Sequence, residues 1–296
     1  MFNKAIIGPR LSAYLFLHLA ILLNSSRSDA GAWTQKKGHF YSKFGLLRFE
    51  STSQYRLNGN RETLSDNGRV LDVSVYSYLE YGIFDDLTFI ASLPFKRISF
   101  SCAIEDCGNT STGFGDVFWG LRYRLSQTDW IVSIQSGLKI ALGYETDEEA
   151  LDSAPPIGDG QTDIEFRLQL GRSLFNYNGY VTIDAGYRGR GGEPVDEIPF
   201  AFEIGVDLTK DYVLIGRVQG VRSITEKEGQ NDFRIVDGQV VNFIGTGSVE
   251  DFVKVNAQLI YHMTSKFDLS FEFEQTLAGR NTSHATIFGG GIAFHK

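Results

Sequence analysis

The sequence is short of several features that mark common classes of protein. Its 296 residues carry a formal net charge of −8 and show no basic stripe, which excludes nucleic-acid binding because that needs a positive surface for the phosphates. The glycine clusters at 189–192 and 289–291 are not followed by the strand-to-helix context of a phosphate-binding loop. Beyond residue 32 no long apolar run occurs, so no membrane-spanning helix is expected there.

One apolar run precedes that point. Residues Tyr14–Leu23 are ten consecutive mostly apolar residues, with Lys4 and Arg10 before them and the small-x-small pattern Ala30-Gly31-Ala32 after them. A spanning helix needs about 20 apolar residues, so this pattern indicates a cleaved secretory signal peptide. We therefore predict a signal peptide over 1–32 and one mature domain over 33–296, which begins with a short tail, Trp33–Gly38.

The two cysteines, Cys102 and Cys107, both follow the signal peptide and lie five positions apart. In an oxidising compartment such a pair is expected to form a disulfide that closes one small loop and contributes about 2 kcal/mol. A metal pair or a redox pair is the alternative, but the sequence lacks the partner ligands and the C-x-x-C spacing that these need.

The stretch 113–143 shows the pattern that organises the rest of the chain. Its apolar positions alternate with polar or small ones, turn at 126–129, and alternate again on the return run. The first run sets Val117, Trp119, Leu121, Tyr123 and Leu125 against Asp116, Phe118, Gly120, Arg122 and Arg124. A period of two predicts strands, and runs of about 9 to 11 residues are long enough to cross a bilayer when tilted. We interpret the stretch as one hairpin of an outer-membrane β-barrel, apolar outside and polar inside.

The same pattern recurs along the mature chain. The predicted strands are His39–Glu50, Val70–Tyr81, Leu87–Phe100, Val117–Leu125, Trp130–Leu142, Thr162–Leu174, Gly179–Arg188, Pro199–Leu208, Tyr212–Arg222, Asp251–Met263, Leu269–Thr276 and Ala285–Phe294. Short and long connections alternate between them, the shortest of the long class being Ala278–His284. This alternation is typical of outer-membrane barrels, whereas a soluble β-sandwich has shorter strands. The fold class predicted is therefore all-β, a single antiparallel transmembrane β-barrel of about 12 strands with both termini periplasmic.

The polar face of these strands supplies the candidate functional residues. The predicted lumen-lining residues are Asp72, Glu80, Asp116, Arg122, Arg124, Lys139, Asp163, Glu165, Arg167, Asp184, Arg188, Glu203, Asp207, Lys254, Glu272 and Glu274. Two interpretations remain open, because buried charges need partners in either case. The residues line a polar, cation-leaning pore, or they form a salt-bridged network that fills the lumen.

Catalytic and metal sites are not predicted. Ser283 and His284 are neighbours in sequence, which is no evidence of a hydrogen-bonded catalytic pair. The acidic stretch 145–152 lacks the ligand order of a calcium loop. We therefore expect no enzyme activity and no cofactor.

A family resemblance can be stated on particular residues. Gly113-Phe114-Gly115-Asp116-Val117, followed by Gly120-Leu121-Arg122-Tyr123-Arg124, resembles the outer-membrane barrel family named "MetA-pathway of phenol degradation". The opening Trp33-Thr34-Gln35-Lys36-Lys37-Gly38 and the segment 81–89 resemble related barrels, some of them associated with surface polysaccharide or adhesion. The resemblance implies a porin-like channel for small hydrophobic or aromatic solutes. One departure is that Phe294 is followed by His295-Lys296, whereas such barrels usually end on an aromatic residue.

Two functions are therefore carried forward for a protein expected in the bacterial outer membrane. The first is passive passage of small, hydrophobic or aromatic, solutes through the barrel. The alternative is a structural or surface-interaction barrel whose long extracellular loops bind a polymer. The expected partners are outer-membrane lipid and lipopolysaccharide, the outer-membrane assembly machinery and small-molecule solutes; the sequence does not set the oligomeric state.

Overall fold

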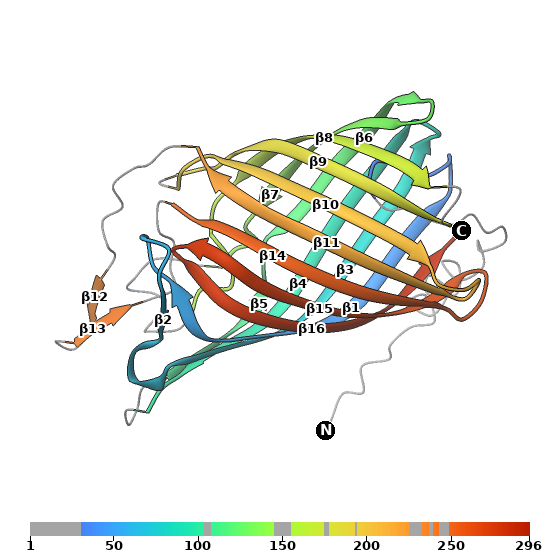
Figure 1. Ribbon diagram of the computed structural model, residues 1–296. Coiled ribbons are helices and arrows are strands. Elements are labelled where there is room, and N and C mark those ends of the chain that lie inside the picture. The colour runs from blue at the N-terminus through green and yellow to red at the C-terminus, as the bar shows by residue number, and fades with distance from the viewer. Residues whose placement is uncertain are drawn as a thin grey trace, which may run out of the picture.

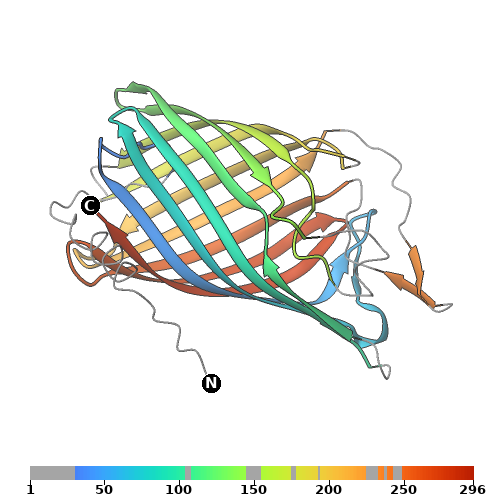
Figure 2. The same ribbon diagram turned by 180° about the vertical axis from the view of Figure 1, so that it is seen from behind.

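The computed structural model describes residues 31–103, 108–144, 155–174, 178–192, 194–224 and 249–296, together with the backbone of 233–236 and 239–242. The wall of the molecule is a closed antiparallel barrel (Figures 1 and 2). Its twelve strands are β1 (Phe40–Tyr55), β3 (Arg69–Phe84), β4 (Leu87–Ser101), β6 (Val117–Gln127), β7 (Ile131–Ile140), β8 (Asp163–Leu174), β9 (Gly179–Gly189), β10 (Glu197–Asp207), β11 (Tyr212–Ser223), β14 (Asp251–His262), β15 (Phe267–Arg280) and β16 (Thr282–His295). The predicted all-β antiparallel barrel of about 12 strands is confirmed; the periplasmic position of both termini stays a prediction.

Closure occurs between the first and last strands. β1 pairs with β16 from Tyr41 opposite His295 to Tyr55 opposite Thr282, with one register shift after Ser51. All other wall strands pair with their neighbours in chain order. Closure matters because an open sheet edge in lipid would leave backbone N–H and C=O groups without hydrogen-bond partners.

Four short strands outside this wall were not predicted. β2 (Arg61–Thr63) pairs with β1, and β5 (Gly108–Phe114) pairs with β4. β12 (Phe233–Val236) and β13 (Gln239–Asn242) form a separate hairpin. Pro94, for which the sequence suggested a bulge or a poorly paired position, lies where β4 changes its partner from β6 to β5. A proline fits such a position because it cannot donate to the ladder.

The connections fall into two classes at opposite ends of the barrel. The short-turn end carries the connections after β3, β6, β8, β10 and β14, together with the C-terminus (Figure 1); the long-loop end carries the others. The predicted loop Ala278–His284 is wrong, because β15 and β16 are joined by Asn281 alone, with φ +52°. Asparagine tolerates this left-handed conformation. The strand ends beyond the apolar belt are polar, so the sequence pattern did not distinguish them from a loop.

The two faces of the wall differ as predicted. Trp119, Leu121 and Tyr123 on β6 are 41%, 39% and 48% exposed on the outside, whereas Arg122 between them is 4% exposed. Aromatic side chains gather near the short turns, where the rings of Tyr212 and Tyr261 stack at 4.9 Å. Cys102 forms a disulfide, and Cys107 lies outside the described residues. In the described part of the chain, no helix is long and apolar enough to cross a membrane.

The two faces predict different tolerance of charge at neighbouring positions. Leu168 on β8 is 50% exposed on the outer face, and Gln169 beside it is 6% exposed inside the barrel. We expect Leu168→Arg to lower the free energy of unfolding by about 2–4 kcal/mol, because its guanidinium faces lipid near mid-depth. Urea unfolding in vesicles measures this, with Leu168→Ala as the size control. Equal losses in Leu168→Arg and Gln169→Arg would contradict the assignment of faces.

Candidate solute pathway

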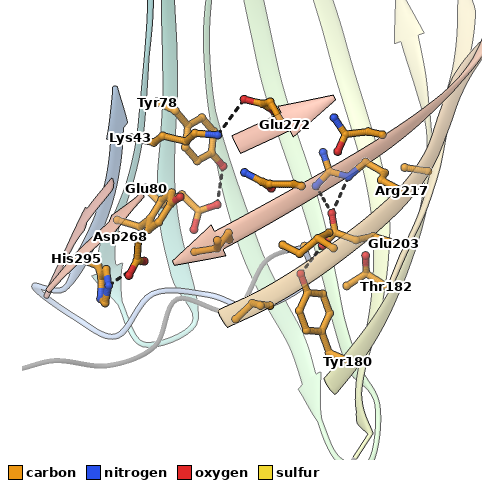
Figure 3. A pocket seen from close by; sticks show the side chains of 18 of the residues that line it. Lys43, Tyr78, Glu80, Tyr180, Thr182, Glu203, Arg217, Asp268, Glu272 and His295 are labelled. Carbon is orange, nitrogen blue, oxygen red and sulfur yellow. Dashed lines mark hydrogen bonds and ion pairs between the residues drawn. The ribbon is translucent and has the colours of Figure 1, made fainter. Parts of the chain in front are cut away.

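A cavity of about 1430 Å³ lies inside the barrel (Figure 3). At the short-turn end its lining includes Lys210, Asp211 and Thr264, which belong to two of the short turns. Deeper in the barrel the lining reaches Glu165 and Arg188. The cavity therefore runs from the short-turn end into the body of the barrel.

The predicted lumen residues divide into two groups. Those that line the cavity are Glu80, Arg122, Glu165, Arg167, Asp184, Arg188, Glu203, Asp207, Glu272 and Glu274. Those outside its lining are Asp72, Asp116, Arg124, Lys139, Asp163 and Lys254. Lys254 and Asp72 form ion pairs with Glu274 and Lys96, at 3.4 and 3.7 Å. Arg124 lies at the short-turn rim and pairs with Asp86.

The most enclosed ion pair of the cavity joins Arg122 on β6 to Glu80 on β3, at 3.1 Å. Both side chains are about 5% exposed. Glu80 also accepts hydrogen bonds from Tyr78 Oη at 2.6 Å and from Gln35 Nε2 at 2.9 Å. A buried carboxylate with three donors is satisfied, so this pair holds the wall in one arrangement rather than serving as a free charge.

Two further ion pairs face the cavity from other strands, and their basic partners were missed in the sequence (Figure 3). Lys43 on β1 lies 3.2 Å from Glu272, and Arg217 on β11 donates from Nε to Glu203 at 2.6 Å. Lys43 was missed because the outer face of β1 also carries a charge, Arg48, so the two faces of this strand do not differ clearly in the sequence. Arg217 was missed because both faces of β11 carry apolar residues, so the sequence does not show which face points inward.

The cavity lining differs between its two sides. On β1, β3, β4 and β6 the aromatic and apolar side chains Leu47, Tyr76, Tyr78, Ile90 and Phe118 lie beside the charged residues already described. On β11 and β14 the amides of Gln219, Asn256 and Gln258 lie beside aliphatic side chains. Glycines shape the aromatic side, because a Cβ at Gly45 would collide with the Tyr76 ring and one at Gly137 with the Phe118 ring. The rings can therefore lie flat against the wall and leave the lumen open.

The N-terminal segment 31–38 enters the barrel, although the sequence suggested only a tail. Ser133 Oγ donates to the carbonyl of Ala32 at 2.5 Å, and Arg122 donates to the carbonyl of Trp33 at 2.9 Å. The Trp33 ring packs edge-on against Tyr180 at 5.7 Å. These contacts come from β6, β7 and β9, so the segment lies inside the short-turn end of the barrel along this part of the wall and narrows the lumen.

At the long-loop end a charged cluster lies beyond the cavity. Arg190 contacts Glu197 and Asp159, each at 2.7 Å, and Lys139 contacts Asp163 at 2.7 Å. The side chains of Arg190, Glu197 and Asp163 are 7%, 2% and 1% exposed. Buried apolar residues from three loops, Ile157, Val195 and Val249, accompany the cluster. We name Lys139, Asp159, Asp163, Arg190 and Glu197 the loop-end cluster. A solute moving along the barrel axis has to pass this cluster.

Other sites find no support among the described residues. His284 Nε2 lies 3.3 Å from Gln275 Nε2, and its ring packs against Tyr55. No group of three or more metal-ligating side chains occurs in the described ranges. The acidic stretch 145–152 lies wholly outside them.

The N-terminal segment yields a test of pore width. We expect Trp33→Ala combined with Gln35→Ala to raise single-channel conductance, because both changes remove side chains packed inside the short-turn end of the barrel. Planar-bilayer recording measures the change. Lys36→Ala is the matched control, since the exposed Lys36 side chain makes no contact of this kind. Unchanged conductance in the double variant would show that the constriction lies elsewhere.

The loop-end cluster yields a test of pH dependence. Burial disfavours ionisation of Asp159, but Lys139 and Arg190 hold the pKa of its carboxyl below the ordinary value of 3.8. Because the folded-state pKa is lowered, the stabilising contribution is present above pH 3.8 and is lost as the pH falls through the folded-state value.

We therefore expect conductance to stay constant between about pH 7 and 5 and to change only below about pH 4. Bilayer recording across this range measures it, and Asp159→Asn should show the low-pH behaviour at neutral pH. A transition near pH 6 would instead implicate a histidine.

Comparison with known proteins gives a likeness in structure alone. No family model matches the chain, and no curated relative matches it. The chain is similar to the COG4313 outer membrane channel from Pseudomonas putida F1, with 13% identity, coverage of 92% of this chain and 100% of that one, and a TM-score of 0.69. Lower TM-scores of 0.49 and 0.44 relate it to the NanC porin (11% identity, 86% and 98% coverage) and to the translocator domain of autotransporter NalP from Neisseria meningitidis (9% identity, 99% of both chains). The resemblance to the phenol-degradation family stays a prediction, and the fold is that of a bacterial outer-membrane β-barrel channel.

Proposed function

We propose that the protein is a passive channel for small solutes, with its short-turn end in the periplasm. The observation that carries this proposal is the polar-lined cavity of about 1430 Å³, which reaches from two of the short turns into the body of the barrel. A filled barrel would have packed side chains in this space. The charged side chains of the wall form ion pairs with partners one or two strands away or on the same strand, so the charges do not need to fill the lumen.

The solutes are small molecules with one aromatic or apolar side and one polar side. Tyr76, Tyr78 and Phe118 offer ring faces on one wall, where an aromatic solute can stack. Gln219, Asn256 and Gln258 offer amide donors and acceptors on the other side, where its polar groups can form hydrogen bonds. This two-sided lining agrees with the solute class implied by the family resemblance.

Charge adds a preference for cations over anions. The acidic residues of the lining are Glu80, Glu165, Asp184, Glu203, Asp207, Asp211, Asp268, Glu272 and Glu274, and the basic ones, histidine aside, are Lys43, Arg122, Arg167, Arg188, Lys210 and Arg217. Carboxylates therefore outnumber the lysine and arginine side chains in the pathway. A narrow pathway with an acidic excess raises the local concentration of cations.

Transport assays test the proposal directly. Purified protein should give unitary conductance in planar bilayers and should allow small neutral solutes to swell liposomes. The proposal would be rejected if both assays gave nothing.

Selectivity supplies a sharper test of the assigned lining. We expect Glu272→Gln with Glu274→Gln to lower the permeability of cations relative to anions, because two carboxylates of the lining lose their charge. Reversal potentials in a salt gradient measure this ratio. Glu62→Gln is the matched control, because Glu62 lies on β2, outside the cavity lining. An equal effect in the control would mean that the lining does not set selectivity.

The surface-interaction alternative depends on the loop 224–250, most of which lies outside the described residues. It stays a prediction, as does the assembly machinery as a partner.

A further inference from the structure

Three arginines gather on the outer face of the wall toward the long-loop end, and the channel function does not involve them. Arg48 on β1 and Arg97 on β4 both lie opposite Val73 of β3, one on each side of it. Arg69 lies four residues from Val73 along β3. Glu50 on β1 pairs with the position between them. The side chains of Arg48 and Arg69 are 45% and 44% exposed, and Arg97 is also exposed. We name Arg48, Arg69 and Arg97 the outer arginine cluster.

Apolar side chains lie next to the outer arginine cluster, on its side toward the short-turn end. Two residues nearer the short-turn end, the same strands present Leu46, Val75 and Phe95, which are 53%, 52% and 42% exposed. β5 extends this row with Phe114, whose ring packs edge-on against Phe95 at 5.1 Å. A row of exposed apolar residues on four adjacent strands thus ends where the arginines begin.

The height of the cluster matches the upper boundary of the hydrocarbon layer. β4 begins at Leu87 at the short-turn end, and ten residue steps separate Leu87 from Arg97. At about 3.3 Å per residue and a strand tilt near 40°, this distance corresponds to about 25 Å along the barrel axis. The apolar band of outer-membrane barrels is about 25 Å tall, so Arg97 lies at its edge. Headgroup phosphates occupy this level in a bilayer.

The cluster has more positive charge than its own contacts neutralise. Glu50 contacts Arg48 at 2.6 Å and Arg69 at 2.8 Å, so one carboxylate serves two guanidinium groups. Arg97 makes no ion pair with any residue in the described part of the chain. Guanidinium groups bind phosphate through two parallel N–H donors, and they do so well at a boundary with apolar surface.

We propose that the outer arginine cluster binds the phosphate groups of lipopolysaccharide in the outer leaflet. The proposal rests on the proposed orientation, with the long-loop end outward, and is independent of solute passage. Arg48 and Arg97 are two strands apart, about 10 Å, so they can reach separate phosphates on one rigid sugar headgroup. The apolar row beneath them is four strands wide and can accommodate several acyl chains. A phospholipid with one phosphate and two chains would use only part of this surface.

Binding of purified, folded protein to lipopolysaccharide tests the proposal. Arg97→Gln is the cleanest variant, because Arg97 has no ion pair to lose among the described residues. We expect Arg48→Gln with Arg97→Gln to weaken binding about tenfold and Arg97→Gln alone to weaken it less, since each change removes a charged phosphate contact. Circular dichroism and heat-modifiable migration on gels confirm that the variants are folded.

Two controls separate this site from general attraction to anionic lipid. Arg172→Gln makes the same change near the short-turn end, where Arg172 lies over the Trp130 ring at 5.4 Å, and it should leave binding unchanged. Dephosphorylated lipopolysaccharide and phosphatidylglycerol should each bind the wild-type protein as weakly as lipopolysaccharide binds the double variant.

If the folded double variant, Arg48→Gln with Arg97→Gln, bound lipopolysaccharide as tightly as the wild-type protein, the proposed site would be wrong. A loss confined to Arg172→Gln would overturn both the site and the orientation. Equal binding of phosphatidylglycerol would show that the cluster does not discriminate between these lipids, which also contradicts the proposal. None of these outcomes bears on conductance, so the channel function is tested separately.

Discussion

The structure depends on one constraint, that backbone N–H and C=O groups surrounded by hydrocarbon need hydrogen-bond partners within the protein. β1 and β16 satisfy it for the two ends of the chain by pairing over most of their lengths. Once the sheet is closed, every strand has one face toward lipid and one toward the axis. The alternation of residues, the burial of the inner charges and the existence of a lumen all follow from that closure.

Closure also explains why the inner charges are arranged in pairs. A residue on the inner face cannot reach bulk water freely, so each charge needs a partner within side-chain reach, on its own strand or on one of the next two strands. Arg122 with Glu80 and Arg167 with Glu165 and Asp184 show this arrangement. Since these pairs lie along the wall, space remains at the axis. The sequence left open a polar pore and a salt-bridged network that fills the lumen; the structure has the ion pairs and also a cavity inside them.

The sequence predicted best those strands whose two faces differ most. On β6 and β8 apolar and polar positions alternate cleanly, and the assigned faces agree with the exposed fractions of their side chains. Lys43 and Arg217 were missed because β1 carries Arg48 on its lipid face and β11 is apolar on both faces. The turn at Asn281 was missed because the strand ends beside it carry no apolar signal. The entry of residues 31–38 into the lumen could not be predicted from the local sequence, since the residues that this segment contacts lie from about 50 to 150 positions away in the chain.

The path of this N-terminal segment has a mechanical consequence. It is bound to Asp85 at the end of β3 and, through Trp33, to Tyr180 on β9, which lies almost opposite in the strand order. A ring of hydrogen-bonded strands resists stretching around its circumference, but it can flatten into an oval at little expense in hydrogen bonds. The N-terminal segment follows the wall between these strands, with contacts to β4, β6 and β7, and opposes a change in the curvature of this arc. The N-terminal segment therefore supports the cross-section of the barrel from within at the short-turn end. Any change that holds or displaces this segment also affects the shape of the barrel there.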